Sequence, residues 1–134
     1  METGIKGMQT IVVTEALTAE AMGSGAEPVF ATPQMIALME NTCLESVQPL
    51  LEEGFSTVGT MVNVTHVSAT PVGMRVTCET ELIEVDDRKL TFAVKAYDEA
   101  GLIGEGTHGR AIIHKKRFRA RAKAKLTEAA ADHS

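Results

Sequence analysis

Hydrophobic positions change their spacing along this chain, and the change separates one long helix from a series of strands. Residues 29–54 (VFATPQMIALMENTCLESVQPLLEEG) repeat with the period of a helix. Thr32 is placed to cap this helix, and Pro33 suits its first position because that N–H has no partner within a helix. Pro49 should kink or end the regular helix, and Gly54 is placed as its C-terminal cap.

One carboxylate falls on the apolar face predicted for this helix. Glu40 shares that face with four apolar or thiol side chains, Ile36, Cys43, Val47 and Leu50. A buried carboxylate without compensation is strongly destabilising, so Glu40 needs polar partners or a raised pKa. From the pattern alone we favour a structural role for Glu40, at the edge of the face or held by a hydrogen bond, over a catalytic one.

Strands are predicted on both sides of the helix, where β-branched and apolar residues alternate with polar ones. Residues 16–28 are small, polar and glycine-containing, which favours a short helical turn and then a flexible segment. Val62, Val64 and His66 should share one face of their strand. The predicted strands cover residues 8–14, 55–67, 74–85, 89–98 and 102–114.

Short turns join the last four strands, which predicts antiparallel neighbours in one sheet that curls around the helix, an α+β fold. The helix covers one face of this sheet and leaves the other partly exposed, so we expect a second copy of the chain to pack against it. The domain is expected to span residues 1–126, with residues 127–134 as a disordered tail.

The 134 residues suffice for one domain with a real core. No apolar run approaches the roughly 18–20 residues of a membrane span, and the N-terminal METGIKGMQTIVV lacks a signal-peptide pattern. We therefore expect no membrane partner and a cytoplasmic location. Cys43 and Cys78 have no metal-type spacing and are expected to be free, buried thiols.

The net charge of −5 is unevenly distributed. Seven of the 13 basic residues lie in the run 115–125 (KKRFRARAKAK), whereas residues 1–114 carry a net charge of −10. The acidic body argues against a nucleic-acid partner. The basic run is predicted to form a helix to about Leu126; it could contact a phosphate, an anionic partner or another subunit, but a solvated terminal helix is the favoured interpretation.

A hydroxyl, a carboxylate and an imidazole, from Thr32, Glu40 and His66, are the parts of a hydrolytic site. Spacing alone does not bring them together, and an isolated histidine is more often structural. A metal site made of His66, His108 and His114 is not expected. His108 and His114 lie roughly 20 Å apart along one predicted strand, which is too far for one ion.

Three longer motifs change this interpretation. FATPQMIALMENTC, VGTMVNVTHVSATPVG and GEGTHGRAIIH resemble the fluoroacetyl-CoA thioesterase-like family of hotdog-fold acyl-CoA thioesterases, over roughly residues 29–118. The resemblance implies an antiparallel sheet wrapped around one central helix, and hydrolysis of a short-chain acyl-CoA to free acid and CoA. It implies no cofactor and no metal, since coenzyme A enters as part of the substrate, and it implies a homodimer, or a tetramer, with the cleft between subunits.

The same resemblance assigns roles to individual residues. The catalytic set falls on Thr32, Glu40 and His66, with His66 as general base and Glu40 as nucleophile or as the group that orients water. Thr32 would hydrogen-bond Glu40 or water, or act as nucleophile itself. The implied substrate-binding residues are Phe30, Gly59, whose N–H polarises the thioester carbonyl, Thr60, and Arg110, which faces substrate or the site across the dimer.

The chain departs from the family pattern before the helix. The family carries an aromatic lid there, whereas this chain has MGSGAEP with Phe30 as the nearest aromatic residue, so we expect a more open pocket that takes other short acyl groups. A hydratase of the same fold would place an aspartate shortly before its histidine, and Asn63-Val64-Thr65-His66 has none. A non-catalytic acyl-CoA-binding module stays an alternative, which an assay of acyl-CoA hydrolysis would separate.

Overall fold

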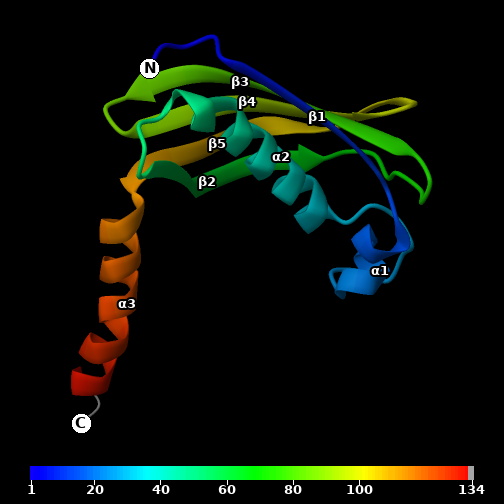
Figure 1. The fold of residues 1–134 in the computed structure, drawn as a ribbon. Helices are drawn as coiled ribbons and strands as arrows, with labels where there is room; N and C mark the ends of the chain where they lie inside the picture. The colour runs from blue at the N-terminus through cyan, green and yellow to red at the C-terminus, as the bar shows by residue number, and fades with distance from the viewer. Residues whose placement is uncertain (133–134) are drawn as a thin grey trace.

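A five-stranded antiparallel sheet wraps around one long helix in the computed structural model, which describes residues 1–132 (Figure 1). The strand order is β1-β3-β4-β5-β2. This is the predicted α+β arrangement. The elements are β1 (Lys6–Val12), the 3₁₀ turn η1 (Glu15–Leu17), α1 (Ala19–Met22), α2 (Thr32–Val47), the 3₁₀ turn η2 (Gln48–Leu50), β2 (Phe55–His66), β3 (Arg75–Asp86), β4 (Lys89–Asp98), β5 (Gly101–His114) and α3 (Lys115–Asp132).

The predicted pairings of β3 with β4 and of β4 with β5 are correct, but the predicted pairing of β2 with β3 is wrong. β2 lies at one edge of the sheet, beside β5. Residues 67–74 cross the end of the sheet to reach β3, three strand positions away. Eight residues can span the roughly 14 Å of three strand spacings. The crossing segment is held by the chain before α2, because the Phe30 N–H donates to the Thr70 carbonyl at 2.8 Å and Val29 bridges Pro71.

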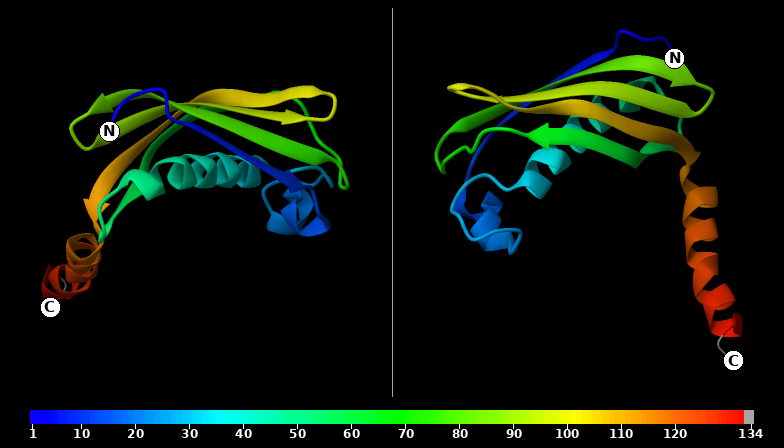
Figure 2. Two further views of the ribbon diagram at one scale, coloured as in Figure 1. Left: turned by 45° about the horizontal axis from the view of Figure 1, so that its top comes forward. Right: turned by 180° about the vertical axis from the view of Figure 1, so that it is seen from behind.

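The buried face of α2 is displaced around the helix from the predicted one. Its buried side chains are Met35, Leu38, Met39, Thr42, Cys43 and Val47. Figure 2 shows that α2 lies on the concave face of the sheet. Ile36 and Glu40 are only half-buried, and Leu50 is 60% exposed. Glu40 thus lies at the edge of the buried face, where its carboxylate escapes the full cost of desolvation.

The ends of α2 differ from the prediction. Ala31 is the N-terminal cap residue, Thr32 is the first helical residue, and the Thr32 side chain makes no capping hydrogen bond. Pro33 is the second helical residue, one position later than predicted, and still lies in the first turn. The regular helix ends at Val47, and the turn η2 that contains Pro49 follows it. Gly54 is therefore not the helix cap; it turns the chain into β2 with a φ of 88°.

The C-terminal helix α3 projects away from the sheet (Figures 1 and 2). It continues to Asp132, so residues 127–132 are helical rather than disordered, and residues 133–134 lie outside the described part of the chain. The segment TEAAAD favours this continuation because alanine has the highest helix propensity. Across residues 1–132, no helix has both the length and the apolar character needed to cross a membrane.

Candidate active site

Thr32 and His66 meet where the start of α2 lies beside the end of β2. The Thr32 hydroxyl and the His66 Nδ1 are 2.7 Å apart. The other ring nitrogen, Nε2, is buried and has no hydrogen-bond partner among the described residues. Burial lowers the pKa of His66 below its ordinary value of 6.5, and a backbone group of Ser68 opposes this shift only in part. The imidazole is therefore neutral near pH 7, as a general base requires.

A hollow of about 300 Å³ surrounds this pair. Its lining includes Phe30, which is 1% exposed, and Ser24, both from the segment between α1 and α2. Val67, which follows β2, also lines it. Thr32 is the first residue of α2, so the positive end of the helix dipole faces the hollow. The hollow thus combines a hydroxyl, a neutral base and a field that favours negative charge.

Glu40 lies two turns further along α2, beside Gly59 of β2. A Cβ atom added to Gly59 would lie 2.9 Å from the Glu40 Oε2 and 3.3 Å from the His108 Cε1. A side chain at this position would therefore displace the Glu40 carboxylate. The register of β2 against β5 also shifts between Gly59 and Met61, so Thr60 lies in a β-bulge, an irregularity that is frequent beside active sites.

A buried hydrogen-bond network supports one wall of a groove that Glu40, Gly59 and Arg110 line. Arg110 is 5% exposed, and its guanidinium donates to the Thr57 hydroxyl at 2.7 Å and to the Thr57 carbonyl at 2.9 Å. The third contact, between the Arg110 Nη1 and the His108 Nε2, is 3.1 Å. Arginine only donates and a carbonyl only accepts, so His108 must accept at Nε2 and donate from Nδ1 to the Met61 carbonyl at 2.8 Å.

This network fixes His108 as a neutral, fully bonded histidine. Burial is the main cause that lowers the pKa of His108, and burial likewise lowers the pKa of Arg110. Arg110 thus lines the groove but is held by protein groups, and its predicted contact with substrate stays a prediction. Neither Thr57 nor the structural role of His108 was predicted from the sequence. The signal for His108 was its i, i+2 spacing from Arg110, which places both side chains on one face of β5.

One chain does not bring all three predicted catalytic residues together. Thr32 and Glu40 are eight residues apart on α2, which is about 12 Å along the helix axis. The groove beside Glu40, about 390 Å³, shares no lining residue with the hollow around His66. The partner of Thr32 within the chain is His66, not Glu40.

The two cysteines are free and buried, as predicted. Burial raises the pKa of Cys43 to about 12 and that of Cys78 to about 11. Both thiols stay protonated, so neither is a competent nucleophile. Within residues 1–132, no three His, Cys, Asp or Glu side chains are grouped closely enough to hold a metal ion.

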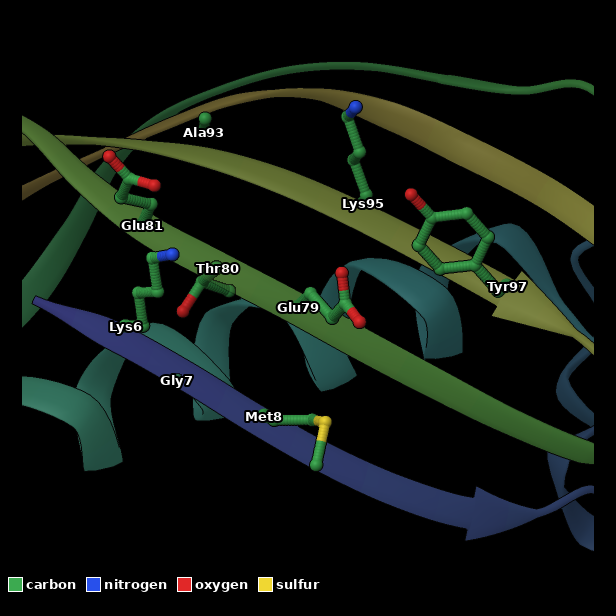
Figure 3. Close-up of a pocket in the computed structure, with 9 residues that line it drawn as sticks. All are labelled: Lys6, Gly7, Met8, Glu79, Thr80, Glu81, Ala93, Lys95 and Tyr97. Atoms are coloured by element: carbon green, nitrogen blue, oxygen red, sulfur yellow. The ribbon is translucent and has the colours of Figure 1, made fainter. Parts of the chain in front are cut away.

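A larger depression, about 620 Å³, lies on the outer face of the sheet, away from α2 (Figure 3). Its lining includes the charged side chains of Lys6, Glu79, Glu81 and Lys95. Opposite charges on neighbouring strands, such as Glu79 and Lys95, stand directly across from each other there. None of the predicted site residues lines this depression, so its size does not make it the active site.

Known proteins match this chain over most of its length. A family model described as "Fluoroacetyl-CoA-specific thioesterase" matches residues 13–116. The chain belongs to this family. It is therefore a thioester hydrolase of the hotdog fold, as the motifs predicted. A fluoroacetyl-CoA thioesterase from Streptantibioticus cattleyicolor is 45% identical over 97 residues, which are 72% of this chain and 70% of that relative.

Solved structures of thioesterases share this architecture. A crystal structure of the fluoroacetyl-CoA thioesterase FlK has a TM-score of 0.88 at 37% identity, and the match covers 93% of this chain and 97% of that one. A thioesterase superfamily member from Thermus thermophilus has a TM-score of 0.89 at 29% identity and covers 97% and 96% of the two chains. Mutants of FlK have been solved with fluoroacetate and CoA, and with acetyl-CoA.

Proposed function

We propose that this protein hydrolyses short-chain acyl-CoA thioesters at a site built from two copies of the chain. The hydrogen bond of 2.7 Å between Thr32 and His66 carries the proposal, because it joins a hydroxyl to a neutral base inside a hollow. Catalysis needs a further carboxylate, and the separation of about 12 Å within one chain means that a second copy must supply it.

The edge strand β2 offers the surface for that second copy. Residues 59–63 of this strand are exposed, and two of them, Met61 and Val62, are each 42% exposed apolar residues. The β2 strands of two copies can pair antiparallel about a two-fold axis, so that the β2 edge of each copy is no longer free. If Gly59 of one strand stands opposite His66 of the other, the partner's Glu40 comes to the Thr32–His66 pair. The site and the dimer would then form together.

The chemistry follows from these groups. His66 takes a proton from water or from the Thr32 hydroxyl, and the freed oxygen attacks the thioester carbonyl. The negative oxygen that develops is stabilised by the partner's Gly59 N–H and by the positive end of α2. The C–S bond breaks, CoA leaves as its thiolate, and the proton on His66 neutralises it. In this direct route the partner's Glu40 orients the attacking water. In the covalent route the same carboxylate attacks the carbonyl and CoA leaves as its thiolate; His66 then takes a proton from the water that hydrolyses the acyl-enzyme and passes it to the thiolate.

We further propose that the substrates carry small acyl groups, acetyl among them. A hollow of about 300 Å³ with Phe30 in its wall fits a short acyl group better than a long one. The segment before α2 is rich in glycine and small residues, so it supplies no aromatic closure above the hollow. Fluoroacetyl-CoA should therefore be one substrate among several rather than the preferred one. The kcat/KM values for fluoroacetyl-, acetyl- and propionyl-CoA, measured with a thiol reagent, would rank them.

A complementation experiment tests the shared site. Glu40→Ala and His66→Ala chains should each be inactive alone. When they are mixed, unfolded and refolded together, each heterodimer contains one intact site, made of Glu40 from one chain and His66 from the other. A statistical mixture should recover about a quarter of the wild-type activity. A site contained within one chain would recover none.

A matched pair of variants is the control. Thr32→Ala and His66→Ala remove groups that lie in the same chain and in the same site, so their mixture should stay inactive. Recovery in this control would contradict the proposed geometry. If the wild-type protein binds short acyl-CoAs but hydrolyses none of them, the non-catalytic binding module would replace the proposed activity.

A further inference from the structure

The basic helix α3 has no role in the hydrolytic chemistry. Its first eleven residues, 115–125, contain seven lysines and arginines and no acid. Residues 116–130 are all exposed, so this charge faces solvent rather than the acidic body of the same chain. The family model ends at residue 116 and leaves almost all of α3 outside the matched region. The family model therefore does not account for the charge of α3.

The arrangement of these charges is unfavourable for a bare helix. Lysine or arginine repeats at i, i+4 along α3, which places like charges beside each other in four pairs: 115 with 119, 117 with 121, 119 with 123, and 121 with 125. Lys115, Lys116 and Arg117 also lie in the first turn, where the helix dipole repels positive charge. A bound polyanion would relieve both kinds of repulsion.

The base of α3 lies close to the Glu40 half of the active site. Gly59, next to Glu40, pairs with Arg110, and β5 runs from there directly into α3 at Lys115. Those five residues of strand cover roughly 16 Å. A second hollow of about 320 Å³, lined in part by Leu51, Phe55 and Ile112, lies between the Glu40 groove and the base of α3, where the Lys115 N–H donates to the Gly54 carbonyl.

We propose that α3 binds the nucleotide end of coenzyme A, at its 3′-phosphate and diphosphate. The pantetheine arm contains two amides and has about the backbone length of four to five extended residues, or about 15 Å. This length matches the distance along β5 from the Glu40 groove to α3. Lysine and arginine are the side chains that bind phosphates best. Because residues 1–114 carry a net charge of −10, α3 also supplies the positive field that attracts this substrate.

Thioesters with and without the nucleotide test this inference, which rests on the proposed function. The variant replaces Arg117, Arg119, Arg121 and Lys123 by glutamine, which keeps helix propensity and removes four charges. For acetyl-CoA we expect KM to rise about tenfold with kcat nearly unchanged, because the lost contacts are to phosphates remote from the reacting carbonyl. For acetyl-pantetheine, which lacks the nucleotide, KM and kcat should equal those of the wild-type protein.

The control variant removes the same number of charges from exposed positions outside α3, by replacing Lys6, Arg75, Lys89 and Lys95 with glutamine. It should leave both substrates unaffected. An unchanged KM for acetyl-CoA in the α3 variant, or an equal rise for both thioesters, would overturn the inference. Calorimetry with CoA and with pantetheine gives the same comparison without turnover, so failure of the hydrolytic proposal would not hide the result.

Discussion

The two halves of the candidate site are built in opposite ways. Thr32 is exposed at the first turn of α2 and bonds to His66, whose Nε2 is buried and has no hydrogen-bond partner among the described residues. Around Glu40, by contrast, buried groups are bonded to one another: Arg110 donates to Thr57 and His108, and Gly59 leaves a close-fitting space for the carboxylate. One half keeps its reactive groups free, whereas the other is supported so that a single carboxylate keeps its position.

This difference indicates how each half should respond to mutation. Loss of a free reactive group removes chemistry and leaves the fold intact. Loss of a supporting group moves its neighbours, and activity and stability then change together.

The largest effect is expected from His66→Ala. Removal of the general base should lower kcat by about 10²-fold or more, while the melting temperature changes little because no other side chain depends on this ring apart from Thr32. Steady-state hydrolysis of acetyl-CoA and thermal unfolding measured on the same preparation check both parts. Turnover near the wild-type rate would remove His66 from the mechanism.

Glu40→Ala should also lower kcat by about 10²-fold or more, whether the carboxylate is a nucleophile or orients water. Glu40→Gln separates the two roles. An amide cannot act as nucleophile but still orients water through hydrogen bonds, so a much milder loss in Glu40→Gln than in Glu40→Ala would favour direct attack by water. A rate close to wild type in Glu40→Ala would exclude Glu40 from catalysis.

Gly59→Ala should lower kcat about tenfold, because the new methyl group would lie 2.9 Å from the Glu40 Oε2 and must displace the carboxylate. Gly7→Ala is the comparison, since its methyl group would lie 2.7 Å from the buried Thr80 hydroxyl, and Gly7 lines neither the hollow around His66 nor the groove beside Glu40. Gly7→Ala should lower the melting temperature but keep kcat in the folded protein. Loss of activity in both variants to the same degree would contradict a specific role for Gly59.

The smallest effect is a shift of the pH profile. Burial holds the pKa of folded His66 below 6.5, so the neutral base persists until the pH falls through that lowered pKa. The acidic limb of kcat/KM should therefore lie below pH 6.5. The same shift costs no stability above pH 6.5, where the ring is neutral in both states, but it lowers the stability of the fold as the pH falls toward the folded pKa, because only the unfolded chain then takes up the proton. An acidic limb above pH 6.5 would contradict the assignment.

Much of the fold could be predicted from local pattern. The period of the hydrophobic residues gave the long helix, the alternation gave five strands, and the turns at Asp86–Arg88 and Glu99–Gly101 gave the β3-β4-β5 order. The position of β2 could not be predicted this way, because it depends on the pairing of residues 67–74 with the chain before α2, a contact between distant segments.

The sequence by itself determined the family, the helix that carries Thr32 and Glu40, and the strand face that carries Val62, Val64 and His66. These follow from motifs and from the geometric periods of helix and strand. Tertiary structure decided which groups meet: Thr32 bonds to His66 rather than to Glu40, and Arg110 is held by Thr57 and His108. Periodicity fixes the face on which a side chain lies, but only the packing of α2 across the sheet sets the distance between side chains on different elements.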